Sequence, residues 1–325
     1  MSASILVAGC GAIGGIYAAH LAKVAKVTAY DTNPAHVAAI NRDGLKISGR
    51  TEAHARIEAL GAADQLAGRR FDALIIAVKS LYTADLLRTL LPRLTGRPLI
   101  YTLQNGQGNV ELLLAACDWD VAQGMTWEAG EYLGPGQIRH LIHGSVSWMG
   151  PARGSLEGAE RLAELLDRAG LPTRATADPR GAIWSKFIFN CAMNPVSALL
   201  RGIPEAKYQS EEVYELLRDM VAEGLRVAQG LGITPLYPPL QIVEDVRAGK
   251  IPLPRHPGSR AQDMERGAPI EIDALTGYMI RKAAEVGVPV PMHEAVYRLM
   301  KGLEFGTRTV RERTDLNSSK MRSPT

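Results

Sequence analysis

Short apolar runs alternate with helical patterns through the first half of the chain. Four β-rich runs have the length of buried strands, and they cover residues 4–8, 26–30, 73–78 and 99–103. Segments with the spacing of amphipathic helices lie between them, at residues 13–23, 34–42 and 81–91. Because this alternation is typical of parallel strands joined by helical crossovers, we predict a doubly wound α/β domain over residues 1–177.

The pattern changes after these strands. Gly134-Pro135-Gly136 marks a turn between two strand-like stretches that end near Trp148, and we expect them to be an antiparallel addition to the sheet. From about residue 178 onward, strand-like runs are rare, and helical patterns are typical of an all-α domain over residues 178–308. Residues 309–325 are polar, which predicts a mobile tail. The predicted helices lie at residues 158–169, 183–200, 211–231, 240–248 and 274–286.

Composition and charge narrow the classes of protein to consider. The chain has 325 residues, of which 46% are hydrophobic and 22% charged, as expected of a globular protein with two domains. A net charge of +3 gives no reason to expect a nucleic acid or an anionic membrane as partner. No run approaches the roughly 18 apolar residues that span a bilayer. Cys10, Cys117 and Cys191 form no disulfide framework or CxxC pair, so we expect a cytoplasmic protein without a bound metal.

A glycine-rich turn joins the first predicted strand to the first predicted helix. In this turn Gly9 permits a tight bend, Gly11 lets the backbone approach a pyrophosphate, and Gly14 allows close helix–strand packing. Backbone N–H groups at the start of the helix would face the phosphates. The turn therefore predicts a dinucleotide site, with a glycine turn that binds no ligand as the alternative. Its residues are Gly9, Cys10, Gly11, Ala12, Ile13 and Gly14.

Asp31 indicates which dinucleotide is bound. It closes the second predicted strand 22 residues after Gly9, where a carboxylate can bind the 2′-hydroxyl of the adenosine ribose. A carboxylate there repels the 2′-phosphate of NADP, and the nearest downstream cation, Arg42, is a full helix away. We therefore expect NAD(P)H as cofactor, with NADH favoured over NADPH. The alternative is that Asp31 serves only the turn before the next helix.

Two more loops follow predicted strands at the same edge of the sheet, where ligands of this fold bind. Lys79 follows the third strand and can face a phosphate or a substrate carboxylate. Asn105 follows the fourth strand and can form hydrogen bonds with a ribose or a substrate. A solvated lysine and a simple Asn-Gly turn are equally open interpretations of these two positions.

A polar stripe interrupts the first helix of the second domain. Lys186, Asn190 and Asn194 recur at intervals of four, which places them on one helical face. Aromatic neighbours such as Phe187 favour a stripe that lines a site, and a plain surface helix is the alternative. Pro195 predicts that the backbone bends or ends at Asn194.

Taken together, these motifs resemble the ketopantoate reductase (2-dehydropantoate 2-reductase) family over nearly the whole chain. The resemblance implies a Rossmann-type N-terminal domain, a helical C-terminal domain, and NAD(P)H-dependent reduction of a branched 2-oxo acid between them. The implied reaction is reduction of 2-dehydropantoate to pantoate, a step of pantothenate biosynthesis. The matching motifs are the glycine turn, Val78-Lys79, Gln104-Asn105-Gly106, Gly134-Pro135-Gly136 with His140, Lys186-x3-Asn190-x3-Asn194, Ser259-x2-Gln262-Asp263 and Glu271-Ile272-Asp273.

The resemblance also implies a role for each polar residue. Lys186 is similar to the general acid that protonates the carbonyl oxygen as hydride reaches C2, and desolvation of its ammonium would suit that task. Glu271 is similar to the carboxylate that binds the substrate beside this lysine, although capping the next helix is an alternative for Glu271 and Asp273. The residues similar to other binding groups are Asn190, Asn194 and Ser259 for the substrate, and Lys79 and Asn105 between cofactor and substrate.

The chain also departs from the family pattern. Asp31 stands where most members have a basic residue. Trp127-Glu128-Ala129 stands where the family has small residues, and the sequence does not reveal the role of Trp127 and Glu128. Two other functions stay open: a related NAD-dependent 2-hydroxy or β-hydroxy acid dehydrogenase, or a dinucleotide-binding sensor without catalysis. A homodimer is also open, through the apolar faces of helices 211–231 or 274–286.

Overall fold

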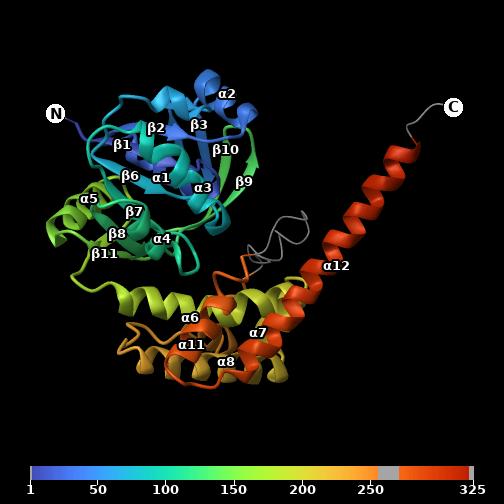
Figure 1. Ribbon diagram of the computed structural model, residues 1–325. Helices are drawn as coiled ribbons and strands as arrows, with labels where there is room; N and C mark the ends of the chain where they lie inside the picture. The colour runs from blue at the N-terminus through green and yellow to red at the C-terminus, as the bar shows by residue number, and fades with distance from the viewer. Residues whose placement is uncertain (1, 255–270, 322–325) are drawn as a thin grey trace. The chain divides into compact units, whose positions relative to one another are not determined.

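The structure is a computed structural model that describes residues 2–254 and 271–321, with side-chain surroundings up to residue 307. Its contacts divide the chain into two compact units, Met1–Ile183 and Trp184–Thr325 (Figure 1). The division falls inside a long helix, α6 (Arg180–Leu199), a little beyond the predicted start of the second domain at residue 178.

An eight-stranded sheet forms the centre of the first unit, in the order β12-β11-β8-β7-β6-β1-β2-β5 (Figure 1). Its neighbours pair in parallel except β8 and β11, which are antiparallel. Because the strand order reverses beside β1, the crevice at the carboxyl ends of β1 and β6 is where ligands bind in this fold. The strands are β1 (Ser4–Ala8), β2 (Lys26–Tyr30), β5 (Glu58–Leu60), β6 (Ala73–Ile76), β7 (Leu99–Thr102), β8 (Val121–Met125), β11 (Ser147–Arg153) and β12 (Thr173–Ala175).

Helices cover both faces of this sheet because the strand residues that point to each face are apolar. In β1, Ile5 and Val7 pack into the core under α1 and α5, whereas Leu6 and Ala8 pack into the opposite core under α3 and α4. The doubly wound α/β prediction is therefore confirmed. The elements between the strands are α1 (Ala12–Leu21), α2 (Pro34–Asp43), α3 (Thr83–Leu90), α4 (Asn109–Ala116), α5 (Leu156–Arg168) and the 3-10 turns Ala63–Leu66, Ser80–Tyr82 and Leu91–Arg93.

The hairpin at Gly134-Pro135-Gly136 corrects one prediction. Its strands, β9 (Ala129–Gly134) and β10 (Gln137–Ile142), are antiparallel, but they do not extend the main sheet. They form a separate four-stranded sheet in the order β4-β3-β10-β9, with β3 (Leu45–Gly49) and β4 (Ala53–Ala55). Ile138 of β10 packs so closely on Gly15 that a side chain there would collide with it. Helix α1 therefore lies between the two sheets.

The second unit is helical in its described part, as predicted. Its core packs apolar residues of α6, α8, α11 and α12, and it includes the faces of α8 and α11 that were candidates for a dimer contact. Helix α12 (Pro291–Met321) is helical through most of the segment predicted to be a mobile tail, so only the mobility stays a prediction. Within the described residues, no helix has the length and apolar character needed to cross a bilayer. The remaining helices are α7 (Pro204–Gln209), α8 (Glu211–Gly230), α9 (Gln241–Arg247) and α11 (Thr276–Glu285).

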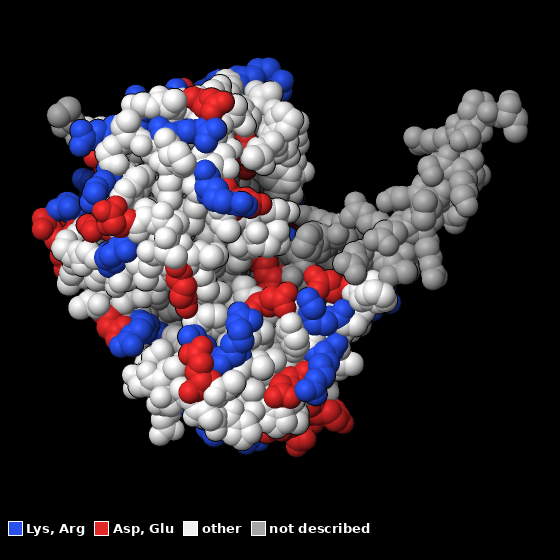
Figure 2. Space-filling view, viewed as in Figure 1, with Lys and Arg blue, Asp and Glu red and all other residues white. Residues whose placement is uncertain are grey.

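Charged side chains of both signs are interspersed over the visible face of the molecule (Figure 2). Several form exposed ion pairs, such as Arg69 with Glu58 at 2.5 Å and Arg180 with Asp178 at 2.7 Å. Exposed pairs of this kind contribute little to stability, about 0–1 kcal/mol each. Neither sign of charge dominates this face.

Helix α6 continues through Pro195 to Leu199, so it does not end at Asn194. A proline has no N–H to donate to the carbonyl four residues earlier, which is that of Cys191. The hydroxyl of Thr276, which is fully buried, donates to this carbonyl oxygen at 3.4 Å instead. A side chain 85 residues away thus replaces the backbone hydrogen bond that Pro195 removes.

We expect Thr276→Val to lower the free energy of unfolding by about 1–3 kcal/mol, because it leaves the buried Cys191 carbonyl without this donor. Urea denaturation of the whole chain measures the change. Thr276→Ser keeps the hydroxyl and is the matched control, with a smaller expected loss. Equal losses in the two variants would show that the hydroxyl of Thr276 does not support α6.

Candidate functional site

The glycine turn lies between β1 and α1, at the carboxyl edge of the main sheet. Gly9 has a left-handed φ of +87°, and a Cβ there would lie 2.7 Å from Cγ1 of Val78. A Cβ on Gly14 would collide with the carbonyl oxygen of Gly9, whereas one on Gly11 meets nothing within 4 Å. The backbone is therefore open at Gly11, beside the N-terminus of α1. This arrangement fits a pyrophosphate bound by backbone N–H groups.

Asp31 connects the end of β2 to the glycine turn. Its Oδ2 accepts a hydrogen bond from the backbone N–H of Cys10 at 2.9 Å, and its Oδ1 accepts one from that of Asn33 at 2.9 Å. Asp31 therefore holds the turn through two backbone N–H groups. Because each carboxylate oxygen can accept a second hydrogen bond, a ribose hydroxyl can also bind. Burial raises the pKa of the Cys10 thiol, which lies in the core, so Cys10 offers a ligand only its backbone.

His36 on α2 holds the glycine turn from behind, a role that sequence reasoning missed. Its Nδ1 accepts from the backbone N–H of Gly136 at 2.9 Å, so its Nε2 carries the proton and donates to the carbonyl of Cys10 at 2.8 Å. The ring is 1% exposed. The sequence contains no signal for this bond beyond the position of His36 in the helix that follows Asp31.

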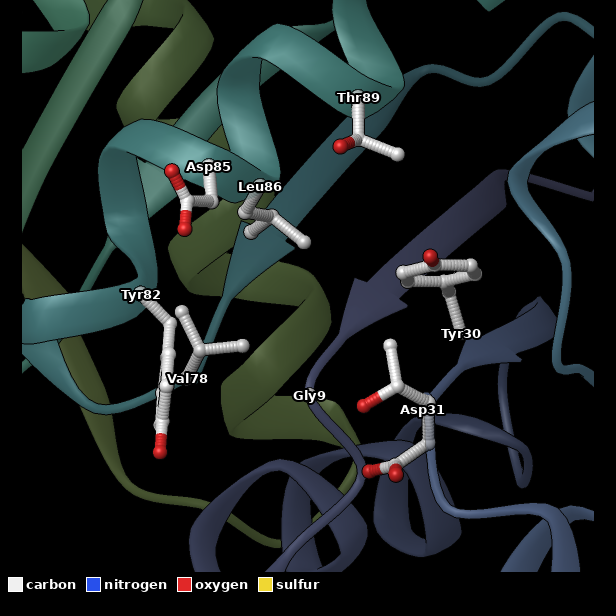
Figure 3. Close-up of a pocket in the computed structure, with 9 residues that line it drawn as sticks. Gly9, Tyr30, Asp31, Val78, Tyr82, Asp85, Leu86 and Thr89 are labelled. Atoms are coloured by element: carbon white, nitrogen blue, oxygen red, sulfur yellow. The ribbon is translucent and has the colours of Figure 1, made fainter.

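A pocket of about 220 Å³ opens beside the glycine turn. In Figure 3 the side chains of Tyr30 and Asp31 lie on one side, and those of Leu86 and Thr89 on the other. Apolar and aromatic walls suit the flat face of a purine. The residues that line the pocket are Gly9, Tyr30, Asp31, Thr32, Val78, Tyr82, Asp85, Leu86 and Thr89.

The charge of this lining bears on cofactor choice. It contains two carboxylates, Asp31 and Asp85, and neither a lysine nor an arginine. Asp85 is ion-paired with Arg88, which does not line the pocket. Arg42, the nearest downstream cation after Asp31, pairs with Asp43 at 2.7 Å at the other end of α2. No basic side chain in this lining therefore offsets the negative charge of Asp31.

The loops that carry Lys79 and Asn105 are joined to each other. The hydroxyl of Ser80 donates to the carbonyl of Asn105 at 3.0 Å, and Nε2 of Gln104 donates to the carbonyl of Val78 at 2.7 Å. Since Val78 also packs on Gly9, both loops lie beside the glycine turn. The structure thus brings together the three loops of the first unit that were predicted to bind the cofactor.

In the second unit, Lys186, Asn190 and Asn194 all lie on α6, at positions that share one helical face. Asn190 is only 7% exposed, and Lys186 and Asn194 are partly covered. This burial is unlike that of a plain surface helix. Burial lowers the pKa of Lys186 to about 8, so near neutral pH its ammonium gives up a proton more readily than an exposed lysine.

Of the other predicted site residues in the second unit, the structure describes Glu271 but not Ser259. Glu271 is partly buried at the start of the described segment before α11, and Ser259 lies outside the described residues. The N-cap of α11 is Leu275, so neither Glu271 nor Asp273 caps this helix. Asp273 instead accepts from the hydroxyl of Tyr297 at 2.6 Å and pairs with Lys301, both on α12.

Comparisons with known proteins agree over both units. The family model Ketopantoate reductase PanE/ApbA matches residues 5–154, and its C-terminal counterpart matches residues 178–304. A 2-dehydropantoate 2-reductase of Mesorhizobium japonicum is 30% identical over 322 residues, covering 92% of this chain and 97% of the relative.

Solved structures of similar fold cover nearly all of the chain. A PanE/ApbA family ketopantoate reductase from Ralstonia eutropha JMP134 matches with a TM-score of 0.83 and 28% identity, covering 94% of this chain and 99% of that one. D-mandelate dehydrogenase, solved with NADH and anilino(oxo)acetate, matches with a TM-score of 0.85 and the same coverage. At 20% identity, this second likeness is one of fold.

Proposed function

This chain belongs to the ketopantoate reductase family of oxidoreductases acting on CH–OH groups, and from that premise we propose that it reduces 2-dehydropantoate to pantoate with NADH. The observation that carries the proposal is Lys186, a lysine whose pKa is lowered to about 8, on one helical face with two asparagines. A binding protein without catalysis has no need of a lysine adapted to release a proton near neutral pH.

When bound, NADH would supply a hydride to C2 of the 2-oxo acid. The carbonyl π electrons move to the oxygen, and the Lys186 ammonium donates the proton that converts this oxygen to a hydroxyl. Its positive charge also stabilises the negative charge that develops on the oxygen. We assign binding of the substrate hydroxyl and carboxylate to Asn190, Asn194 and Ser259. To Glu271 we assign a hydrogen bond to the substrate and a role beside Lys186.

We further propose that the glycine turn and its neighbours hold the cofactor. Backbone N–H groups of residues 9–14 would bind the pyrophosphate, Asp31 the adenosine ribose, and the pocket beside it the adenine. Lys79 and Asn105 would bridge cofactor and substrate. The preference for NADH is supported by the carboxylate of Asp31 in a lining that has no cation. A cytoplasmic location is supported by the free thiols of Cys10, Cys117 and Cys191.

We expect the reduction rate to fall as the pH rises through about 8, because Lys186 must be protonated to act as the acid. Oxidation of the hydroxy acid needs the neutral amine, so its rate should rise over the same range. Profiles of kcat/KM in both directions, from about pH 6 to 10, measure this dependence. If neither profile changes near pH 8, Lys186 is not the group that exchanges the proton.

A panel of 2-oxo acids tests the proposed substrate. Oxidation of NADH and NADPH is followed with 2-dehydropantoate, with phenylglyoxylate and with short unbranched 2-oxo acids. We expect the highest kcat/KM for 2-dehydropantoate with NADH. Fast turnover of another 2-oxo acid in its place would favour a related NAD-dependent 2-hydroxy acid dehydrogenase, which the acidic lining of the cofactor pocket makes the second candidate. Saturable NADH binding without any turnover would favour the sensor.

A further inference from the structure

Three histidines and a glutamate meet in the first unit at the end of α1 opposite the glycine turn. Glu128 lies between β8 and β9, His140 on β10 and His143 directly after β10, while His20 is in the last turn of α1. Glu128 and His140 are 5% and 1% exposed, and the side chain of His143 is 25% exposed. One ligand atom from each of Glu128, His140 and His143 lies within 4.8 Å of the others.

A chain of hydrogen bonds fixes the protons on these rings. The carbonyl of Ala169 can only accept, so Nδ1 of His20, 3.1 Å away, carries a proton. With its one proton on Nδ1, a neutral His20 ring has a bare Nε2. Nε2 therefore accepts from the hydroxyl of Thr51 at 3.0 Å. Having donated its proton, the hydroxyl oxygen of Thr51 accepts from Nδ1–H of His140 at 2.7 Å.

This chain of bonds leaves Nε2 of a neutral His140 as a bare lone pair that faces the carboxylate of Glu128. Two acceptors in direct contact in a buried place repel each other unless a cation lies between them. Nδ1 of His143 also lies 3.1 Å from the same oxygen of Glu128. The cation that these groups hold is therefore either a proton or a metal ion.

The donor set favours a metal ion. Two imidazoles and a carboxylate, with one position left for water, form a recurrent zinc site. Ligand atoms around a tetrahedral ion with bonds of about 2.0–2.1 Å lie roughly 3.3 Å apart. His143 Nδ1 and Glu128 Oε2 are 3.1 Å apart, close to this value, whereas His140 Nε2 and Glu128 Oε2 are in direct contact and would move apart to hold an ion. Ligating histidines are held in place by a hydrogen bond from the other ring nitrogen, and Thr51 receives that bond from His140. The partial exposure of His143 leaves a route of entry.

We propose that Glu128, His140 and His143 bind a divalent transition metal ion of the Zn²⁺ class, with Thr51 and His20 as positioning residues. The site gives Glu128 a role that the sequence leaves open, and it departs from the expectation of no metal. His20 and Ala12 are eight residues apart on α1, or about 12 Å along the helix, so the ion lies away from the glycine turn. The ion would therefore join the β8–β9 loop to β10, away from the proposed pyrophosphate site.

Metal titration of the chelator-treated full chain tests this site. We expect wild type to take up about one equivalent of Zn²⁺ with a rise in Tm, and Co²⁺ to give the visible absorption of a low-symmetry site. His143→Ala and Glu128→Gln should lose both the uptake and the rise in Tm. His54→Ala is the matched control, since His54 is exposed on β4 outside the cluster, and it should bind metal as wild type does.

Thr51→Val tests the positioning role without removing a ligand. It deletes the acceptor for His140 Nδ1–H while keeping the shape of the side chain, and we expect metal affinity to fall about 10–100-fold. Circular dichroism shows whether each variant is folded. If Glu128→Gln does not fold, His143→Ala still tests the site. Wild type that takes up no metal and shows no change in Tm would mean that a proton joins His140 to Glu128. Uptake that survives both ligand variants would place the metal elsewhere, and either result overturns the proposal.

Discussion

Replacing Lys186 with methionine should lower kcat for 2-oxo acid reduction by about 10²–10⁴-fold, the usual contribution of a positioned proton donor. Methionine keeps much of the length and apolar contact of the side chain but has neither a proton nor a charge. The affinity for NADH should stay the same, because the proposed cofactor groups lie on the other unit. Steady-state kinetics and fluorescence titration with NADH measure the two quantities.

A surface lysine provides the matched control for this variant. Lys250 has a side chain that is 67% exposed and pairs only with Asp245 among the contacts described, so Lys250→Met should keep wild-type kcat. Wild-type turnover in Lys186→Met would remove Lys186 from the mechanism. A large fall in Tm together with lost NADH binding would instead assign Lys186 a structural role.

Replacing Asp31 with alanine should weaken NADH binding by about 10–100-fold, because it removes a hydrogen bond to a charged group worth about 1.5–3 kcal/mol. NADPH binding should be weakened much less, because the same change removes the repulsion of the 2′-phosphate. The preference for NADH should therefore shrink or reverse. Dissociation constants of both cofactors, measured with wild type and variant, test this expectation.

The two roles of Asp31 predict different outcomes. If Asp31 only anchors the turn through the N–H groups of Cys10 and Asn33, both cofactors should weaken by the same factor. Asp31→Asn replaces one of the two acceptor oxygens with an NH2 group, which cannot accept from the N–H of Cys10 or Asn33, so it should also weaken both cofactors by the same factor if anchoring is the whole role. Tighter binding of NADPH than NADH by wild type would contradict the proposed preference directly.

Local patterns were enough to predict the elements around the cofactor loops. The predicted strands 4–8 and 26–30 coincide with β1 and β2, because buried parallel strands are short, continuous apolar runs bounded by turns. The glycine turn and Asp31 could be proposed as cofactor residues because the motif they form involves residues near one another in sequence. The polar stripe of α6 was likewise visible as a spacing of four.

Contacts between distant residues could not be predicted in this way. The second sheet pairs β3 with β10 across about ninety residues of chain, and neither strand has a pattern that identifies its partner. At Pro195 in α6, the carbonyl that lacks its backbone donor accepts a hydrogen bond from the hydroxyl of Thr276 in another helix. His36 and the cluster around Glu128 depend on rings brought together by the fold. In this cluster only the spacing His140-x2-His143 is visible in the sequence, and it does not identify Glu128 as a partner.

The most direct test of the proposed function follows the hydride itself. NADH deuterated at the transferred position of the nicotinamide is incubated with 2-dehydropantoate and the wild-type chain, and the product is examined by NMR and mass spectrometry. We predict pantoate that carries one deuterium at C2, formed at the rate at which NADH is consumed, and almost none with Lys186→Met. Saturable NADH binding with unchanged 2-dehydropantoate, or pantoate without deuterium at C2, would contradict the proposed reaction.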